Sequence, residues 1–328
     1  MEFPYIAKCV VERYLSGVRI DTFLAKRFRS YTSWRMHRMV RAGQAWVNGE
    51  PAEPARRVYT GQEVTIRLID PPDDLMPAEN IPLGVVYEDD ALLVVNKPAG
   101  LIVHPCGERP RGTLTNAVQW HVDRTSPLKG LLKPGVVHRL DRDTSGLIAI
   151  AKEHLSHRLL SMQFQAGDVS KAYIALVDGV LGDDIGLIDR PIGRVPGCSS
   201  ALMTSAPNAL EARQSQTAFE VLERYPRHSL VKAFPKTGRL HQIRVHLASL
   251  GHPVVGDEYY AAFGELKPPR PPLLPDGTRP GPPISPLIPR HALHATLLAF
   301  VHPITNRTME FTADIPKDMR AAIELVRE

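Results

Sequence analysis

Hydrophobic positions near the start of the chain recur with a helical period. The spacing i, i+3, i+4, i+8, which marks one face of a helix, is met by Ile20, Phe23, Leu24 and Phe28. This spacing predicts a first helix over residues 18–30, and a second is expected over residues 33–42, ended by Gly43. Asn48-Gly49 predicts a hairpin, and alternation over residues 64–68 predicts a strand. The start of the chain is therefore expected to form a small module of helices and a hairpin.

The remainder of the chain alternates short apolar segments with a few helical ones. Strands are expected at residues 92–95, 147–151, 173–177, 230–234, 297–301 and 309–312. Helices are expected at residues 114–122, 154–165, 241–250 and 317–326. The regular strand–helix–strand rhythm of a parallel sheet is missing, so we predict an α+β fold with a mixed, largely antiparallel sheet.

Two composition breaks divide the 328 residues. Pro71-Pro72-Asp73-Asp74 begins a linker expected over residues 71–82, which separates an N-terminal domain at 1–70 from a second domain at 83–328. Residues 267–289 hold ten of the thirty prolines, too many for a helix or strand. We therefore predict a proline-rich insertion at about 262–289 in the second domain.

Positive charge is concentrated in the predicted N-terminal domain. Residues 1–70 contain twelve Lys and Arg against seven Asp and Glu, an excess equal to the formal net charge of the whole chain, +5. Between Lys26 and Arg41 there are six basic residues and no acid. A merely solvated face normally carries acids as well, so nucleic-acid binding is favoured. The expected contacts are Lys26, Arg27, Arg35, Arg38 and Arg41.

Several functional classes receive no support from the sequence. No apolar run is long enough to cross a bilayer and the first residues lack a signal pattern, so we expect a cytoplasmic protein with no membrane partner. Three widely spaced cysteines and thirteen histidines without ligand spacing predict no metal site and no disulfide framework. Glycine-rich phosphate-binding motifs are missing, so no cofactor is expected.

The polar segment His138-Arg139-Leu140-Asp141-Arg142-Asp143-Thr144-Ser145-Gly146 runs directly into an apolar strand. Its small polar residues and glycine suit a tight turn that leaves Asp141 accessible, and its arginines favour an ionised carboxylate. Such a carboxylate is a candidate nucleophile or base. The alternative is a solvated turn whose aspartates accept hydrogen bonds from backbone amides.

Two further segments offer candidate chemistry. In the helix that follows Gly238, Ile243 and Leu247 form an apolar stripe, while His241 and Arg244 share another face one turn apart. Arg244 either points towards a site or lies on the surface of an amphipathic helix. Tyr173, on a predicted strand among small residues, either stacks on a planar ligand or is a core residue.

Four segments resemble, in their order and amino-acid sequence, motifs of the RluA-type pseudouridine synthase family. They are residues 87–105 with Asn96-Lys97-Pro98-Ala99-Gly100, the loop at 138–146, Lys171-Ala172-Tyr173, and residues 237–257 with Gly238-Arg239-Leu240-His241-Gln242-Ile243-Arg244. Arg290-His291-Ala292-Leu293-His294-Ala295 is similar as well. The resemblance covers about residues 80–320, and residues 17–68 resemble the S-four-type RNA-binding domain.

This resemblance implies an RNA-modifying isomerase that detaches uracil from its ribose, rotates it and rejoins it through carbon 5. It implies that Asp141 is the essential carboxylate, attacking the sugar or abstracting a proton, that Arg244 pairs with Asp141, and that Tyr173 stacks under the uracil. Arg139 would fill the space left by the flipped nucleotide. Further substrate-binding positions implied by the motifs are Lys97, His138, Leu140, Arg239 and Ile243.

Other functions stay open at this point. A transfer RNA synthase is an alternative to an enzyme of large-subunit ribosomal RNA, and a monomer is expected in either case. A non-catalytic RNA-binding ribosome-assembly factor would have lost the reaction, but Asp141, Tyr173 and Arg244 are all present. A glycoside hydrolase would need a second acid, for which Asp143 is the nearby candidate.

Overall fold

The structure is a computed structural model that describes residues 4–28, 31–69, 77–105, 111–125, 135–198, 201–268, 271 and 285–328. The chain divides into two compact units, each made of several segments. The first unit contains Met1–Leu93, Val103–Val137 and Ala149–Ser161. The second contains Val94–Ile102, His138–Ile148 and Met162–Glu328.

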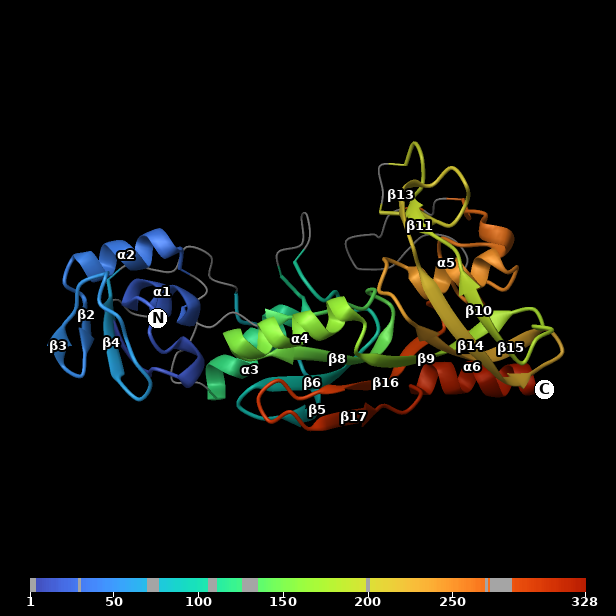
Figure 1. Cartoon of the computed structure of the whole chain (residues 1–328). Coiled ribbons are helices and arrows are strands. Elements are labelled where there is room, and N and C mark those ends of the chain that lie inside the picture. Colours follow the sequence, from blue (N-terminus) through green and yellow to red (C-terminus); the bar gives the residue numbers. More distant parts are fainter. Residues whose placement is uncertain are drawn as a thin grey trace. The chain divides into compact units, whose positions relative to one another are not determined.

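The start of the first unit has a four-stranded antiparallel sheet in the order β1-β4-β2-β3, accompanied by two helices (Figure 1). Its elements are β1 (Tyr5–Val10), a 3-10 turn (Arg13–Leu15), α1 (Ile20–Arg27), α2 (Ser33–Arg41), β2 (Ala45–Val47), β3 (Glu50–Pro51) and β4 (Glu63–Leu68). The four apolar side chains that predicted the first helix are fully buried in a core confined to this segment. Asn48 and Gly49 have the positive φ angles that a tight hairpin requires and join β2 to β3. The N-terminal domain at 1–70 and the linker after it stay predictions.

The rest of the chain is built around a ten-stranded sheet in the order β10-β14-β15-β9-β16-β8-β6-β5, with β17 beside β16 and β7 beside β8. Its strands are β5 (Gly84–Glu88), β6 (Leu92–Lys97), β7 (Gly135–Val136), β8 (Ser145–Ala151), β9 (Ser170–Asp178), β10 (Ile185–Asp189), β14 (Gln216–Arg224), β15 (His228–Pro235), β16 (Leu293–Val301) and β17 (Thr308–Thr312). The pairings of β9, β14 and β15 are antiparallel, whereas β16 runs parallel to β8. The predicted α+β class with a mixed, largely antiparallel sheet is confirmed.

Helices and a small sheet complete the architecture. The helices are α3 (Leu114–Thr125), α4 (His154–Ala166), α5 (Gln242–Ser249) and α6 (Lys317–Arg327), with a 3-10 turn at Ala262–Gly264. A three-stranded sheet is formed by β11 (Ile192–Arg194), β12 (Met203–Thr204) and β13 (Leu210–Arg213). Among the described residues, no helix has the length and apolar character needed to span a bilayer.

Each helix and strand predicted from the sequence is found, with shifted ends, and several strands were missed. The helix expected at 241–250 is α5, but every one of its residues is buried, so the interpretation of Arg244 as a surface residue is wrong. Most of the predicted proline-rich insertion lies outside the described residues. So do Arg29, one of the six basic residues from Lys26 to Arg41, and Cys106, one of the three cysteines.

Candidate active site

The loop before β8 presents Asp141 in a fixed conformation. The amide of Thr144 donates to the carbonyl of Asp141 at 3.2 Å, closing a turn. Gly146 follows with φ +115°, and a Cβ atom there would lie 2.2 Å from the carbonyl oxygen of Ala295 on β16. Only glycine allows β8 to begin this close to β16. The loop is thus anchored at its end by the sheet.

Lys97 supports the same loop from below the surface. It is fully buried, and its ammonium donates to the carbonyls of Pro98, Leu101 and Arg142, each at 2.9 Å. Burial lowers the pKa of Lys97 to about 7, while three carbonyl acceptors favour the protonated form. Because these bonds use all three N–H groups, Lys97 holds the backbone next to Asp141. Its contact with a substrate stays a prediction.

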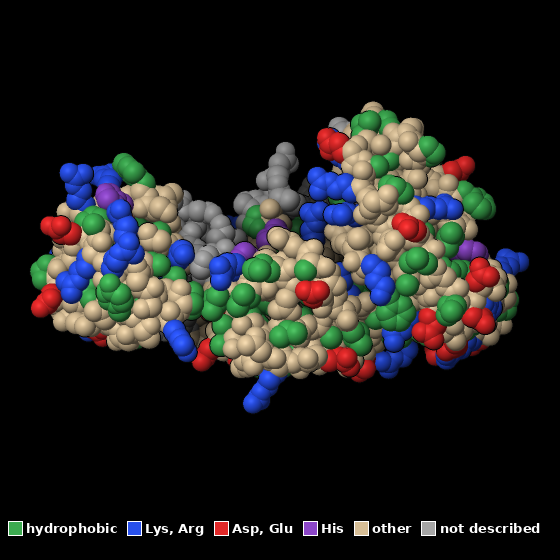
Figure 2. Space-filling view, in the orientation of Figure 1, with side chains coloured by type: hydrophobic (Ala, Val, Ile, Leu, Met, Phe, Trp, Pro, Cys, Tyr) green, Lys and Arg blue, Asp and Glu red, His purple; other side chains and the backbone are tan. Residues whose placement is uncertain are grey.

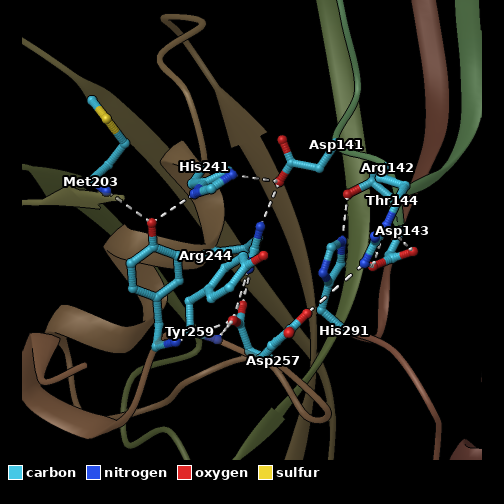
Figure 3. A network of polar contacts seen from close by, with 12 residues as sticks. Asp141, Arg142, Asp143, Thr144, Met203, His241, Arg244, Asp257, Tyr259 and His291 are labelled. Atoms are coloured by element: carbon cyan, nitrogen blue, oxygen red, sulfur yellow. Dashed lines mark hydrogen bonds and ion pairs between the residues drawn. The ribbon is translucent and has the colours of Figure 1, made fainter. Parts of the chain in front are cut away.

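Asp141 is held by a chain of charge-assisted hydrogen bonds that runs into the core (Figure 3). Nη1 of Arg244 donates to Oδ2 of Asp141 at 2.9 Å. Nε and Nη2 of the same guanidinium donate to the two carboxylate oxygens of Asp257 at 2.6 and 2.9 Å. The side chains of Arg244 and Asp257 are 2% and 0% exposed, whereas that of Asp141 is 19% exposed. The buried pair therefore aims one N–H of Arg244 at a carboxylate that solvent can reach.

The carboxylates of the site are ionised at neutral pH. Burial alone would raise the pKa of Asp141, but His241, Arg244 and His291 together hold it below its usual range. The pKa of Asp257 falls to about 2 because the bonds and charge of Arg244 outweigh its burial. The pKa of Asp143 is also lowered, since Arg142 outweighs the effect of burial. Asp143 is therefore a poor proton donor, which argues against the glycoside hydrolase alternative.

His241 is the second group that faces Asp141. Its Nε2 lies 3.9 Å from Oδ2, the same oxygen that Arg244 contacts. Nδ1 of His241 is 2.7 Å from the hydroxyl of Tyr260, which also accepts from the amide of Met203 at 3.1 Å. Burial lowers the pKa of His241 to about 4, so its ring is neutral at pH 7. Figure 3 shows the other oxygen of Asp141 pointing away from both Arg244 and His241.

These side chains line a cavity of about 200 Å³. Its lining includes Asp141, Arg142, Asp143, His241, Arg244 and His291. Pockets for drug-sized ligands measure roughly 300–1,000 Å³, so this one suits a single small ring. His291 stands on its wall with Nε2 2.8 Å from the hydroxyl of Thr144, and burial lowers its pKa to about 3. The cavity thus combines ionised carboxylates with neutral imidazoles.

The structure places the other predicted site residues as follows. Tyr173 lies half-buried on β9, and burial and the charge of Asp141 raise its pKa, so its hydroxyl is protonated at neutral pH. Arg139 is exposed, and Arg239 is half-buried with Nε 3.3 Å from the carbonyl of Gln214. The ring of His138 stacks on Phe164 at 4.4 Å.

Two apolar candidates have almost no accessible surface. Leu140 is 7% exposed and Ile243 is 6% exposed, and Ile243 belongs to the core around β9 and β15. Their contact with a substrate, like the roles of Arg139, His138, Arg239 and Tyr173, stays a prediction.

Sequence reasoning assigned no role to several residues of the site. Asp257 was used only for the resemblance, and no role was given to Tyr260 or His291. One feature of the sequence could have indicated a role for Asp257. It lies in the Gly256-Asp257 turn after α5 with no Lys or Arg close to it in the sequence, so its ion-pair partner has to come from another segment. Among the described residues, no group of three or more His, Cys, Asp or Glu could hold a metal ion.

The predicted RNA contacts of the N-terminal segment differ in exposure. Arg38 and Arg41 on α2 are exposed, and Lys26 and Arg35 are half-buried. Arg27 donates to Glu12 at 3.1 Å in a half-buried ion pair, which makes it the weakest of the five candidates. Trp34, four residues before Arg38, is 64% exposed, and the guanidinium of Arg38 lies 4.7 Å from its ring centre.

Comparison with known proteins extends over most of the chain. Residues 91–249 match the family model described as RNA pseudouridylate synthase. The chain is 36% identical to the uncharacterized RNA pseudouridine synthase YlyB of Bacillus subtilis, over 94% of each chain. It is 35% identical to the ribosomal large subunit pseudouridine synthase D of Xanthomonas campestris, over 98% of this chain and 93% of that one.

Solved structures show the same fold. The structure of human RNA pseudouridylate synthase domain containing 4 is 26% identical, with a TM-score of 0.58, and the match covers 74% of this chain and 93% of the human one. Human RNA pseudouridylate synthase domain containing 1 is 28% identical, with a TM-score of 0.53, over 73% and 85% of the two chains.

Proposed function

The chain belongs to the RNA pseudouridylate synthase family, and we propose that it converts specific uridines of large-subunit ribosomal RNA into pseudouridine, with Asp141 as the essential carboxylate. Family membership makes it an enzyme that isomerises uridine in RNA. The choice of ribosomal RNA is supported by relatives named as ribosomal large subunit pseudouridine synthases, which match nearly its whole length.

The observation that carries the role of Asp141 is its ion pair with a buried arginine. Arg244 is fixed by two bonds to Asp257 and offers its remaining Nη1 to Oδ2 of Asp141 at 2.9 Å. This arrangement keeps Asp141 ionised at the wall of a cavity, which nucleophilic attack on the sugar and abstraction of a proton next to it both require. The second oxygen of Asp141 is available for either reaction.

The remaining roles follow from position and chemistry. Tyr173 carries its proton at neutral pH and is therefore a poor base. We assign it to stacking against the uracil ring rather than to removing the proton from carbon 5. Arg139 is exposed on the same loop as Asp141, and we assign it to the space that a flipped nucleotide leaves in the RNA. Arg239, next to α5, is assigned to the RNA backbone.

We assign the N-terminal segment to RNA binding. Figure 2 shows basic side chains gathered over the face that carries α2. Trp34, Arg38 and Arg41 follow one another at helical spacing and are all exposed. A cationic surface with an exposed aromatic ring combines attraction for phosphate with a platform for an unpaired base.

Tritium release tests the proposed reaction. Purified protein is incubated with unmodified large-subunit ribosomal RNA labelled with tritium at uracil carbon 5, with labelled transfer RNA in parallel. We expect release to water from ribosomal RNA and none from Asp141→Asn, which should still bind RNA. Asp143→Asn removes the same charge two residues away and should keep measurable turnover.

Each other outcome changes a specific part of the proposal. Release from transfer RNA alone would move the substrate to transfer RNA. Turnover by Asp141→Asn would remove Asp141 from the mechanism. RNA binding without release from either substrate would favour a non-catalytic assembly factor, and free uracil would indicate a hydrolase.

A further inference from the structure

His241 occupies a strained backbone position at the start of α5. Its φ and ψ are 55° and 18°, in the left-handed region that few residues other than glycine adopt. Such conformations persist where the surroundings fix them, and they cluster at functional sites. His241 also lines the cavity together with Asp141. Its side chain therefore has a defined direction into the site.

The contacts around the ring favour one of its two neutral tautomers. The backbone N–H of Met203 can only donate, so the oxygen of Tyr260 is the acceptor at 3.1 Å. We assign the single hydroxyl hydrogen of Tyr260 to Nδ1 of His241, its second partner, at 2.7 Å. Since Nδ1 accepts this bond, a neutral ring carries its proton on Nε2.

We propose that His241 is a positioning residue of the uridine isomerisation, whose Nε2–H is held towards Oδ2 of Asp141 by the relay of the Met203 amide and the Tyr260 hydroxyl. The inference rests on the proposed function. Arg244 and His241 then face the same oxygen of Asp141. Arg244 donates a hydrogen bond at 2.9 Å, whereas the neutral N–H of His241 lies at 3.9 Å, where it attracts the carboxylate without a direct hydrogen bond. Together they fix the carboxylate and turn its other oxygen towards the substrate.

The charges around His241 come from several elements and nearly balance. Burial has the largest effect and disfavours the imidazolium. The negative groups that face the ring are Asp141 from the loop before β8 and Asp257 from the turn after α5; the positive groups are Arg244 from α5 and Arg139 from that loop. Tyr259 lies parallel to the ring at 6.0 Å and Tyr260 meets it edge-on at 5.7 Å. A neutral donor adds attraction for Asp141 without placing another full charge in the pocket.

The tautomer can be observed without turnover. In protein labelled with nitrogen-15 at histidine, we expect His241 to show a protonated Nε2 and an unprotonated Nδ1 at neutral pH, and not to become imidazolium above about pH 5. Tyr260→Phe removes the donor to Nδ1, so the ring should titrate at a higher pH. A proton on Nδ1 of the wild-type protein overturns the relay, whether or not the enzyme is active on the RNA tested.

Two substitutions of His241 distinguish a side chain that directs an N–H towards Asp141 from a residue that is needed only for its left-handed backbone conformation. The amide nitrogen of Gln reaches about as far as Nε2, whereas that of Asn reaches only as far as Nδ1. Asn, however, tolerates the left-handed conformation better. If His241 acts as a donor, we expect His241→Asn to lower kcat about tenfold with KM little changed, and His241→Gln to stay within about threefold of the wild type.

The reverse order, with Asn active and Gln impaired, would mean that His241 serves only the backbone and would overturn the proposal. Wild-type rates in both variants would do the same. The assay is tritium release with wild-type protein and Asp141→Asn measured alongside. If the wild type itself releases no tritium, the proposed function fails, and the tautomer measurement still decides the relay.

Discussion

Asp257→Asn is the substitution that most directly tests how Arg244 is held. The carboxylate of Asp257 is fully buried and accepts from Nε and Nη2 of Arg244 and from the backbone amides of Tyr259 and Tyr260. All four partners are donors. Asn keeps the shape but presents an NH2 group to one of them and leaves the charge of Arg244 compensated only by Asp141.

The expected cost follows from burial and from the pKa of Asp257. Removing one partner of a buried ion pair costs roughly 3–5 kcal/mol of the free energy of unfolding. Because the pKa in the folded protein is lowered from 3.8 to about 2, ionisation of this group contributes about 2 kcal/mol that is present above its ordinary pKa. This contribution is lost as the pH falls through about 4 towards 2, and the Asn variant lacks it.

Urea unfolding measured from about pH 7 down to about pH 2 gives the cost of the substitution at neutral pH and its change over the range in which Asp257 titrates. We expect Asp257→Asn to be less stable than the wild type at neutral pH by roughly 3–5 kcal/mol, and to lose less stability on acidification. Its kcat should also be lower, because residue 257 then accepts only one of the two bonds from Arg244. The control is Asp318→Asn. Its carboxylate also accepts two bonds from a buried arginine, Arg290, but its side chain is 40% exposed, so about 1 kcal/mol is expected. Equal stabilities for Asp257→Asn and the wild type would refute the argument.

Three further substitutions test the loop and the N-terminal segment. Gly146→Ala places a Cβ atom 2.2 Å from the carbonyl oxygen of Ala295 and should lower the free energy of unfolding by more than about 3 kcal/mol in urea, whereas Gly61→Ala, also at positive φ but with open space around it, should cost about 1 kcal/mol. Lys97→Met leaves the carbonyls of Pro98, Leu101 and Arg142 without their buried donor and should cost roughly 3 kcal/mol in the same assay; an unchanged stability would contradict the role given to Lys97. Trp34→Ala should weaken binding to an RNA hairpin with an unpaired loop by roughly 5- to 100-fold in a fluorescence titration and leave binding to a perfect duplex little changed; equal losses for both RNAs would exclude stacking.

The sequence predicted elements whose apolar side chains follow one clear period and missed those that do not. The buried stripe of α1 was visible as a spacing. β14 was missed because its second half exposes polar side chains and breaks the alternation. β16 was predicted only from residue 297, since the buried His294 within it reads as polar. Its imidazole is satisfied by Ser145, a partner 149 positions away that no local pattern reveals.

The site shows the same division between local and distant information. The resemblance indicated Asp141 and Arg244, which lie 103 positions apart and meet in the structure. It gave no role to Asp257, because the need for that carboxylate arises only once Arg244 is known to be buried. The position of the proton on His241 likewise depends on the hydroxyl of Tyr260. Residues that hold other residues are determined by tertiary contacts, which periodicity does not encode.

The charges of the cavity indicate which part of an RNA can enter it. Asp141 and Asp143 line the cavity, and Asp257 is buried against Arg244. All three have pKa values below their usual range and carry negative charge at neutral pH. The arginines that line the cavity are already paired: Arg244 with Asp141 and Asp257, Arg142 with Asp143, and Arg290 with Asp318. A phosphate would therefore meet carboxylates without an uncommitted cation, whereas a neutral uracil ring has no such penalty. We infer that only the flipped base and its sugar reach Asp141, while the phosphates stay outside beside exposed residues such as Arg139.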